Sequence, residues 1–184
     1  MKKGLFIIIG LFIINQTSGQ ENDNKKQNVL IINFINPGIE YEYSISDNSK
    51  IALNIGIGVS MSYPDLTKIQ PDHAFFTSSF LDLHYKNIYN YEKRKRNNRD
   101  VEYNAGNFFG LKLIGRGKSF YSTMTRTDNF DFTFGPTWGM RRNFNKINML
   151  FDLGPVFYFD TIGNSGFYPI MFEINIGYNI LTKK

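Results

Sequence analysis

Two histidines, His73 and His84, are the residues of this chain best suited to acid–base chemistry near neutral pH. His84 lies two residues from both Asp82 and Lys86, so an extended strand would place all three on one face. His73 would need a serine and an acid nearby to form a nucleophilic site, and no serine spacing identifies one. The sequence therefore favours a structural polar network around His84, with a nucleophilic enzyme site as the alternative.

Metal and cofactor chemistry have less support. The two histidines are far apart and the chain has no cysteine, so the usual zinc ligands form no cluster. No glycine-rich phosphate-binding loop is present. We therefore expect no metal and no cofactor.

Basic residues gather in one segment, Asn90–Gly106, which contains Lys93–Arg96 and Arg99. The formal net charge is +5, but the charge follows one turn rather than a face, so nucleic acid is not an expected partner. The segment is interpreted as a solvated turn. The alternative is a site for lipid phosphates, peptidoglycan or an acidic partner.

The elements that would position these residues are β-strands. From Tyr168 to Ile180 every second residue is large and apolar, and those between are mostly small or polar. Successive side chains of a strand point to opposite faces, so this period of two predicts one apolar and one polar face. The segments with a strand pattern are residues 28–35, 39–45, 51–61, 75–89, 107–115, 130–140, 147–159 and 168–180.

An export signal precedes the strands. A positively charged start and the apolar run Gly4–Ile14 predict a cleavable signal peptide over residues 1–19. A retained membrane helix is the alternative, but the run is shorter than the roughly 20 residues that span a bilayer. Residues 20–27 are expected to form a flexible lead, and residues 28–184 one β-barrel domain.

Serial strands behind an export signal predict an all-β fold, a closed eight-stranded antiparallel transmembrane β-barrel. The apolar faces of the last three strands alone hold 20 residues. An eight-stranded interior has little room for so many large side chains, so the apolar face is assigned to lipid. Tyr168 and Tyr178 are expected on this face, in two aromatic girdles. A soluble periplasmic lipocalin-like binder, with the apolar face inward, is the alternative.

The polar face would line the lumen, and it carries charges of both signs. Buried charges must be paired or hydrated, which favours a salt-bridged, closed lumen over an ion-conducting one. The predicted lumen network consists of Glu40, Glu42, Asp82, His84, Lys86, Lys112, Asp131, Arg141, Asp152 and Glu173.

Two Gly-Pro pairs interrupt the strand pattern, Gly135-Pro136 and Gly154-Pro155. Proline removes a ladder donor, and a closed barrel has no free edge at which to place it. If residues 143–146 form a tight turn, Gly135 falls opposite Gly154 and the pairs meet as a bulge or sharp twist.

The chain resembles the small outer-membrane β-barrel proteins of Gram-negative bacteria, of the OmpA-transmembrane and OmpX-like type. The likeness is one of pattern and covers nearly all of the mature chain. Besides the signal peptide, the segments that carry it are Pro37–Tyr43, Leu83–Asn87, Asn104–Phe108, Gly135–Gly139 and Gly177-Tyr178.

This resemblance implies an outer-membrane location, outer-membrane lipid and the assembly machinery as partners, and periplasmic termini. Members of the family include adhesion, immune-evasion and structural proteins. The expected role is therefore structural or surface interaction without catalysis. Some eight-stranded barrels deacylate or acylate lipid A, so a lipid A acyl hydrolase or transferase is the alternative that the resemblance implies. An unknown extracellular ligand or protein partner would then contact the loops Ser62–Ala74 and Arg116–Asn129.

Overall fold

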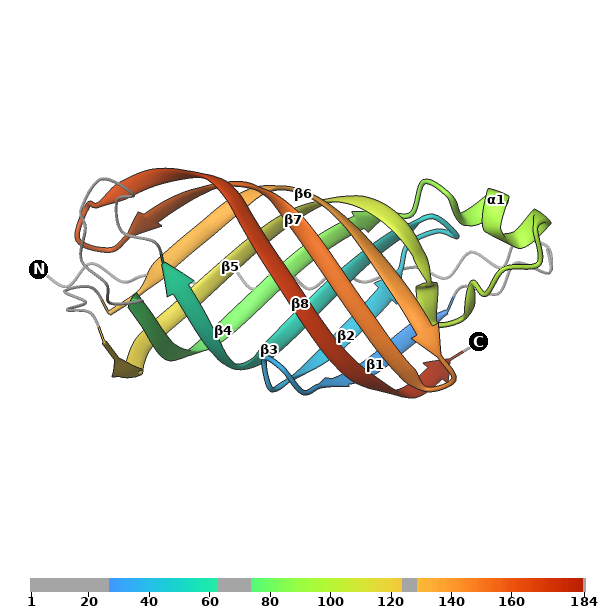
Figure 1. Cartoon of the computed structure of the whole chain (residues 1–184), viewed down its shortest axis with the longest axis horizontal. Helices are drawn as coiled ribbons and strands as arrows, with labels where there is room; N and C mark the ends of the chain where they lie inside the picture. The colour runs from blue at the N-terminus through green and yellow to red at the C-terminus, as the bar shows by residue number, and fades with distance from the viewer. Residues whose placement is uncertain (1–26, 63–73, 124–128, 184) are drawn as a thin grey trace, which may run out of the picture.

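The computed structural model describes residues 27–62, 74–123 and 129–183, and the predicted signal peptide lies outside them. Eight strands form an antiparallel sheet that closes into a ring by pairing β1 with β8 (Figure 1). The predicted all-β class and the closed eight-stranded antiparallel sheet are therefore confirmed. The strands are β1 (Asn28–Asn33), β2 (Gly38–Ser44), β3 (Ser49–Ser62), β4 (Ala74–Asn87), β5 (Gly106–Ser122), β6 (Asp131–Phe144), β7 (Ile147–Asp160) and β8 (Ser165–Lys183).

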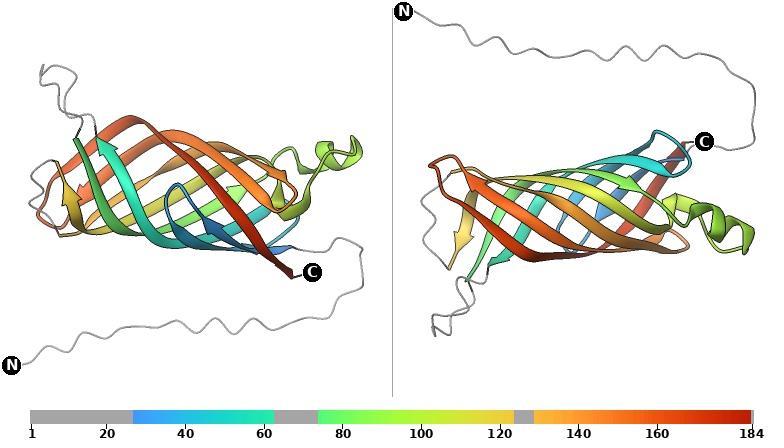
Figure 2. Two further views of the ribbon diagram at one scale, coloured as in Figure 1. Left: turned by 60° about the horizontal axis from the view of Figure 1, so that its bottom comes forward. Right: turned by 90° about the horizontal axis from the view of Figure 1, so that it is seen from above.

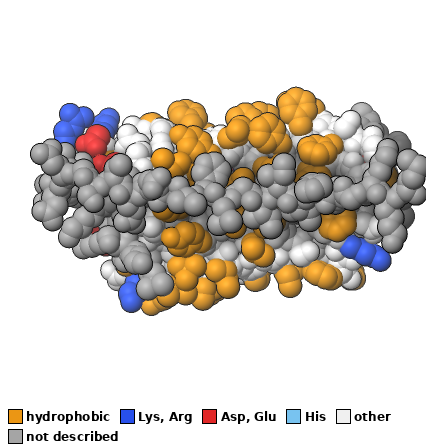
Figure 3. Space-filling view, turned by 180° about the vertical axis from the view of Figure 1, so that it is seen from behind, with side chains coloured by type: hydrophobic (Ala, Val, Ile, Leu, Met, Phe, Trp, Pro, Cys, Tyr) orange, Lys and Arg blue, Asp and Glu red, His pale blue; other side chains and the backbone are white. Residues whose placement is uncertain are grey.

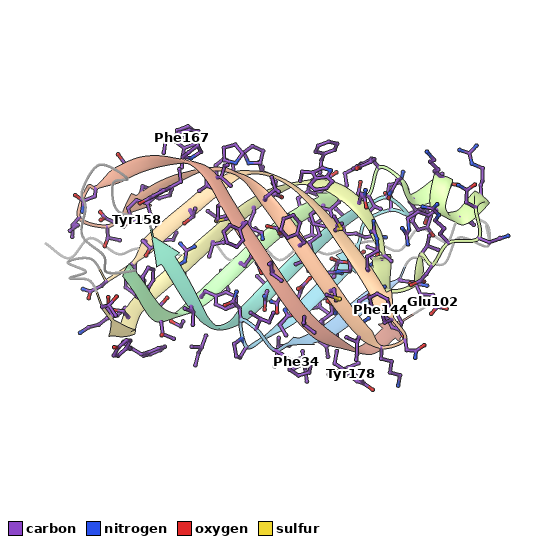
Figure 4. The ribbon with its side chains drawn as sticks, viewed as in Figure 1. Phe34, Glu102, Phe144, Tyr158, Phe167 and Tyr178 are labelled. Atoms are coloured by element: carbon purple, nitrogen blue, oxygen red, sulfur yellow. The ribbon has the colours of Figure 1, made fainter. Side chains whose placement is uncertain are left out.

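Large apolar side chains point outward from the ring. On β3, Ile55 and Ile57 are exposed, whereas Asn54 beside them is buried. Figure 3 shows hydrophobic side chains across the middle of one face and charged side chains near its two ends. Phe34, Phe167 and Tyr178 likewise project from the outside of the wall (Figure 4). The molecule thus has an apolar exterior and a largely polar interior.

The strands are staggered around the ring. A row of paired residues runs from Leu30 on β1 through Leu53 and Leu113 to Phe167 on β8. Leu30 itself pairs with Leu181, near the other end of β8. A stagger of this kind requires strands that are tilted relative to the barrel axis, as Figures 1 and 2 show.

The β1–β2 hairpin is shorter than the rest of the wall. β1 pairs with β8 only as far as Gly177, and β2 pairs with β3 only as far as Gly56. One further bond, from Phe34 N to Ile176 O at 2.8 Å, attaches the tip of the hairpin to β8. Beyond this tip, the described wall consists of the six strands β3 to β8 (Figure 2).

The connection between β4 and β5 lies at the end of the barrel where β1 begins and β8 ends. It contains α1 (Tyr91–Arg96) and a 3-10 helix, η1 (Glu102–Asn104). The Asn104 side chain donates hydrogen bonds to Gln27 O at 3.2 Å and to the Glu42 carboxylate at 2.7 Å, so η1 covers this end of the lumen. Among the described residues, no helix is long and apolar enough to cross a membrane.

The turn between β6 and β7 is tighter than the sequence suggested. Phe144 pairs directly with Ile147, so only Asn145 and Lys146 form the turn. Asn145 has a φ of 55°, a left-handed conformation that asparagine tolerates better than most residues.

The two Gly-Pro pairs do meet across this hairpin, but the tighter turn moves their register by two residues. A Cβ atom on Gly135 would overlap Pro155 O, and one on Gly154 would overlap Pro136 O. The predicted alignment of Gly135 with Gly154 is therefore wrong. Each glycine instead allows the other strand's proline carbonyl to approach.

A register shift between β7 and β8 changes which face the last aromatic residues occupy. Val156 is buried and pairs with Tyr168, whereas the neighbouring exposed pair is Phe157 and Phe167, with ring centroids 5.1 Å apart. Paired residues share a face of the sheet, so Tyr168 belongs to the inner side and Phe167 to the outer side. The prediction that Tyr168 and Tyr178 share the outer face is wrong, because an extra residue in β8 reverses the alternation.

Candidate functional site

The ten residues of the predicted lumen network all lie on the inner side of the wall. Nine are buried, with exposures of 7% or less, and Glu173 is half-buried. Eight of them form two groups, the Arg141 cluster (Glu40, Glu42, Lys86 and Arg141) and the Lys112 cluster (Asp82, Lys112, Asp152 and Glu173).

The Arg141 cluster joins three strands across the lumen. Lys86 Nζ on β4 lies 3.0 Å from Glu40 and 2.9 Å from Glu42, both on β2. Arg141 on β6 donates to the same carboxylates, at 2.7 Å to Glu40 and 2.9 Å to Glu42. Two cations and two carboxylates balance, and charge-assisted hydrogen bonds connect them all.

The Lys112 cluster is unbalanced. Lys112 Nζ on β5 lies 2.6 Å from both Asp152 and Glu173, and 3.8 Å from Asp82. One buried ammonium group therefore serves three carboxylates. Asp82 also borders a cavity of about 10 Å³, which has room for one water molecule.

His84 lies between these clusters. Its Nε2 atom is 2.9 Å from Thr137 Oγ1, and its Nδ1 atom is 3.9 Å from Asp152 Oδ2. The ring also packs edge-on against Phe108, with centroids 5.5 Å apart. Glycine at position 110 leaves room for this contact, because a Cβ atom there would lie 2.6 Å from His84 Nε2.

The order hydroxyl, imidazole, carboxylate is that of a nucleophilic triad. The geometry fits a structural role better, because 3.9 Å is too long for a hydrogen bond from His84 to Asp152. Asp152 is held by Lys112, and Thr137 is only 3% exposed. The one-water cavity that His84 lines would admit no lipid substrate.

Two further ion or hydrogen-bond sites were not anticipated from the sequence. Arg116 donates to Asp131 at 3.0 Å and to Thr133 at 2.6 Å, which gives Asp131 its partner. Lys50 is buried and donates to Ser44 Oγ at 3.0 Å.

Both basic residues were missed because each predicted strand stopped one residue short of them. The third predicted strand began at Ile51 and the fifth ended at Gly115, next to Lys50 and Arg116 respectively. Extending the alternation by one position would have placed both side chains inside. The predicted loop Arg116–Asn129 is correspondingly wrong in its first part, because β5 continues to Ser122.

His73 lies outside the described residues, as do residues 63–73 and 124–128 of the two predicted loops. Within the described part of the chain, no group of three or more histidine, aspartate or glutamate side chains is arranged to hold a metal ion. Comparison of the chain with protein-family models, curated proteins and solved structures gave no match.

Proposed function

We propose that this chain is an outer-membrane β-barrel whose exterior contacts lipid and whose lumen is closed by its own ion pairs. The observation that carries the proposal is the distribution of side chains. Outward positions of the strands are mostly large apolar or aromatic residues, many of them exposed Ile, Leu, Val, Phe and Tyr, whereas the buried charged residues occupy the interior. Lipid replaces water as the favourable environment for such an exterior.

The same distribution argues against a soluble lipocalin-like binder. Such a barrel needs an apolar cavity for its ligand and a charged outer surface. The interior here contains the Arg141 and Lys112 clusters, and the cavity between them has only about 10 Å³.

The proposed role is structural or surface interaction rather than transport or catalysis. The Glu42 carboxylate accepts hydrogen bonds from Lys86, Arg141 and Asn104, which join four chain segments across the lumen and support a closed interior. The contact between His84 and Thr137 favours the lipid-modifying enzyme as second candidate, but the buried site gives that candidate no access for a substrate.

Location and partners follow from the resemblance described above. Export through the signal peptide would deliver the chain to the outer-membrane assembly machinery, with both termini left in the periplasm. The long connections at the opposite end would then face the exterior and provide the surface for a ligand or protein partner.

Fractionation combined with a heat-modifiability gel tests the proposal. The mature protein should sediment with outer membranes, resist carbonate extraction, and migrate differently before and after boiling because the closed sheet persists in detergent. Recovery as a soluble periplasmic protein without detergent would refute the membrane assignment and favour the lipocalin-like binder.

A further inference from the structure

The basic segment between β4 and β5 forms a cleft at the end of the barrel where β1 begins and β8 ends. The cleft has a volume of about 420 Å³, and Lys93, Arg94 and Arg99 contribute positive charge to its walls. Tyr89 and Asn107 line the side formed by the barrel. α1, which carries two of the cationic residues, projects beyond the barrel end (Figure 2).

Positive charge in the cleft is incompletely neutralised. Arg94 is held by two hydrogen bonds to Asp100 O, at 3.0 and 2.7 Å. Burial and the neighbouring charge of Arg142 lower the pKa of Arg94; Asp100 opposes this shift and Arg99 adds to it. Within the described chain, the side chains of Lys93 and Arg99 make no hydrogen bond or ion pair with another residue. The cleft therefore has two cationic groups available for an anion.

The cleft adjoins the aromatic part of the outer wall. Tyr89 lines the cleft and also packs on exposed Phe109, with ring centroids 5.1 Å apart. Trp138 Nε1 donates to the Tyr89 hydroxyl at 3.2 Å. Aromatic residues of this kind mark the boundary between the hydrocarbon and headgroup layers of a membrane.

Beside the cleft, the outer wall beyond these aromatic residues carries polar and cationic groups, although Phe144 at the end of β6 is also exposed. Asn107 lies two positions from Phe109 along β5, and Arg142 lies four positions from Trp138 along β6. Arg142 donates to Asn107 Oδ1 at 2.5 Å. Beside the cleft, apolar, aromatic and cationic groups therefore follow one another toward the end where β1 begins, in the order in which a lipid presents its acyl chains, ester region and phosphate.

We propose that this cleft binds the phosphate of an anionic phospholipid in the membrane leaflet at the barrel end where β1 begins and β8 ends. Lys93 and Arg99 would contact the phosphate, while Tyr89 and Phe109 would contact the lipid above it. This inference rests on the proposed membrane location. A phospholipid fits better than peptidoglycan, because the cleft shares Tyr89 with the lipid-facing wall instead of opening only away from it.

The test uses the mature chain refolded in detergent, with the folded form isolated by its gel mobility. Native mass spectrometry would then measure retention of phosphatidylglycerol and of phosphatidylcholine with the same acyl chains. The test variant is Lys93→Gln with Arg99→Gln. The control is Arg96→Gln with Lys118→Gln, which removes the same charge from positions that do not line the cleft.

Wild type and control should retain phosphatidylglycerol in preference to phosphatidylcholine. The test variant should bind phosphatidylglycerol at least tenfold more weakly, since each cation near an anionic lipid contributes about fivefold. A folded wild type without this preference, or an equal loss in both double variants, would overturn the inference but leave the membrane barrel intact. Binding of peptidoglycan fragments in place of phosphatidylglycerol would also overturn it, whereas failure to fold into detergent at all would count against the barrel itself.

Discussion

Replacing Lys112 with methionine is a sharp test of the lumen, because among the described residues it is the lysine that forms ion pairs with all three carboxylates of its cluster. Methionine keeps a similar length but removes the ammonium group, which lies 2.6 Å from both Asp152 and Glu173. Asp82, at 3.8 Å, would lose the same cation. Arg141→Met is the matched comparison, since Lys86 would remain within 3.0 Å of both carboxylates in the Arg141 cluster.

The charges left behind determine the expected magnitude. Removing one partner of a buried ion pair costs about 3–5 kcal/mol, because an uncompensated charge remains in a poorly solvated site. Arg141→Met leaves one cation for two carboxylates, so the free energy of unfolding should decrease by about 3 kcal/mol. Lys112→Met leaves three carboxylates without a cation, so the decrease in the free energy of unfolding should be about 5 kcal/mol or more.

The free energy of unfolding can be measured by urea titration in lipid vesicles, with Trp138, the single tryptophan, as the fluorescent probe. Adding Asp152→Asn and Glu173→Gln to Lys112→Met should restore at least half of the loss, because it removes two unpaired charges. The loss should also shrink as the pH falls toward about 4, where carboxyl groups take up protons. Equal losses for the two methionine variants, or no recovery in the triple variant, would refute the assignment of charges to a closed lumen.

Three further predictions concern the wall and the histidine. Ile174→Arg should lower the free energy of unfolding in vesicles by about 2–4 kcal/mol, whereas Ile45→Arg at the barrel end should lower it by at most about 1 kcal/mol. Equal decreases would contradict the assignment of the outer face to lipid. Gly154→Ala should lower the free energy of unfolding by about 1–3 kcal/mol, because the new methyl group overlaps a proline carbonyl. Gly166→Ala, with no atom within 4 Å, should change it by less than about 0.5 kcal/mol. Mass spectra of lipid A should be identical for cells with wild type, His84→Ala or no protein; an acyl change that His84→Ala abolishes would support the enzyme.

The strand content of this chain was predictable because its alternation is strong. Large apolar residues recur at every second position in β3 and β7, and a strand is the only regular structure with that period. β5 was cut short because Gly115 and Gly117 occupy the positions where apolar residues should continue. Glycine has no side chain, so the period of two is lost there, although the backbone of Gly115 still pairs with both β4 and β6.

The reversed face of Tyr168 shows a different limit of the same pattern. The alternation continues in the sequence from Tyr178 back to Tyr168, yet the pairs Val156–Tyr168 and Gly154–Met171 leave two residues of β8 opposite one residue of β7. The unmatched segment contains Pro169, which cannot donate a ladder hydrogen bond. Proline within a strand was therefore the available signal for the bulge, although it does not specify which way the alternation changes.

The partners within the lumen could not be read from the sequence at all, because they depend on the stagger of the ring. In the ladder, Glu42 is aligned with Ala52 and then with His84, while Glu40 is aligned with Asp82. The tilt instead directs both glutamates across the lumen to Lys86 and Arg141. Once those two cations are engaged, Lys112 is the lysine or arginine left, in the described part of the chain, to pair with Asp82, Asp152 and Glu173. The imbalance that makes Lys112→Met informative is thus a consequence of strand tilt, which a two-residue period does not encode.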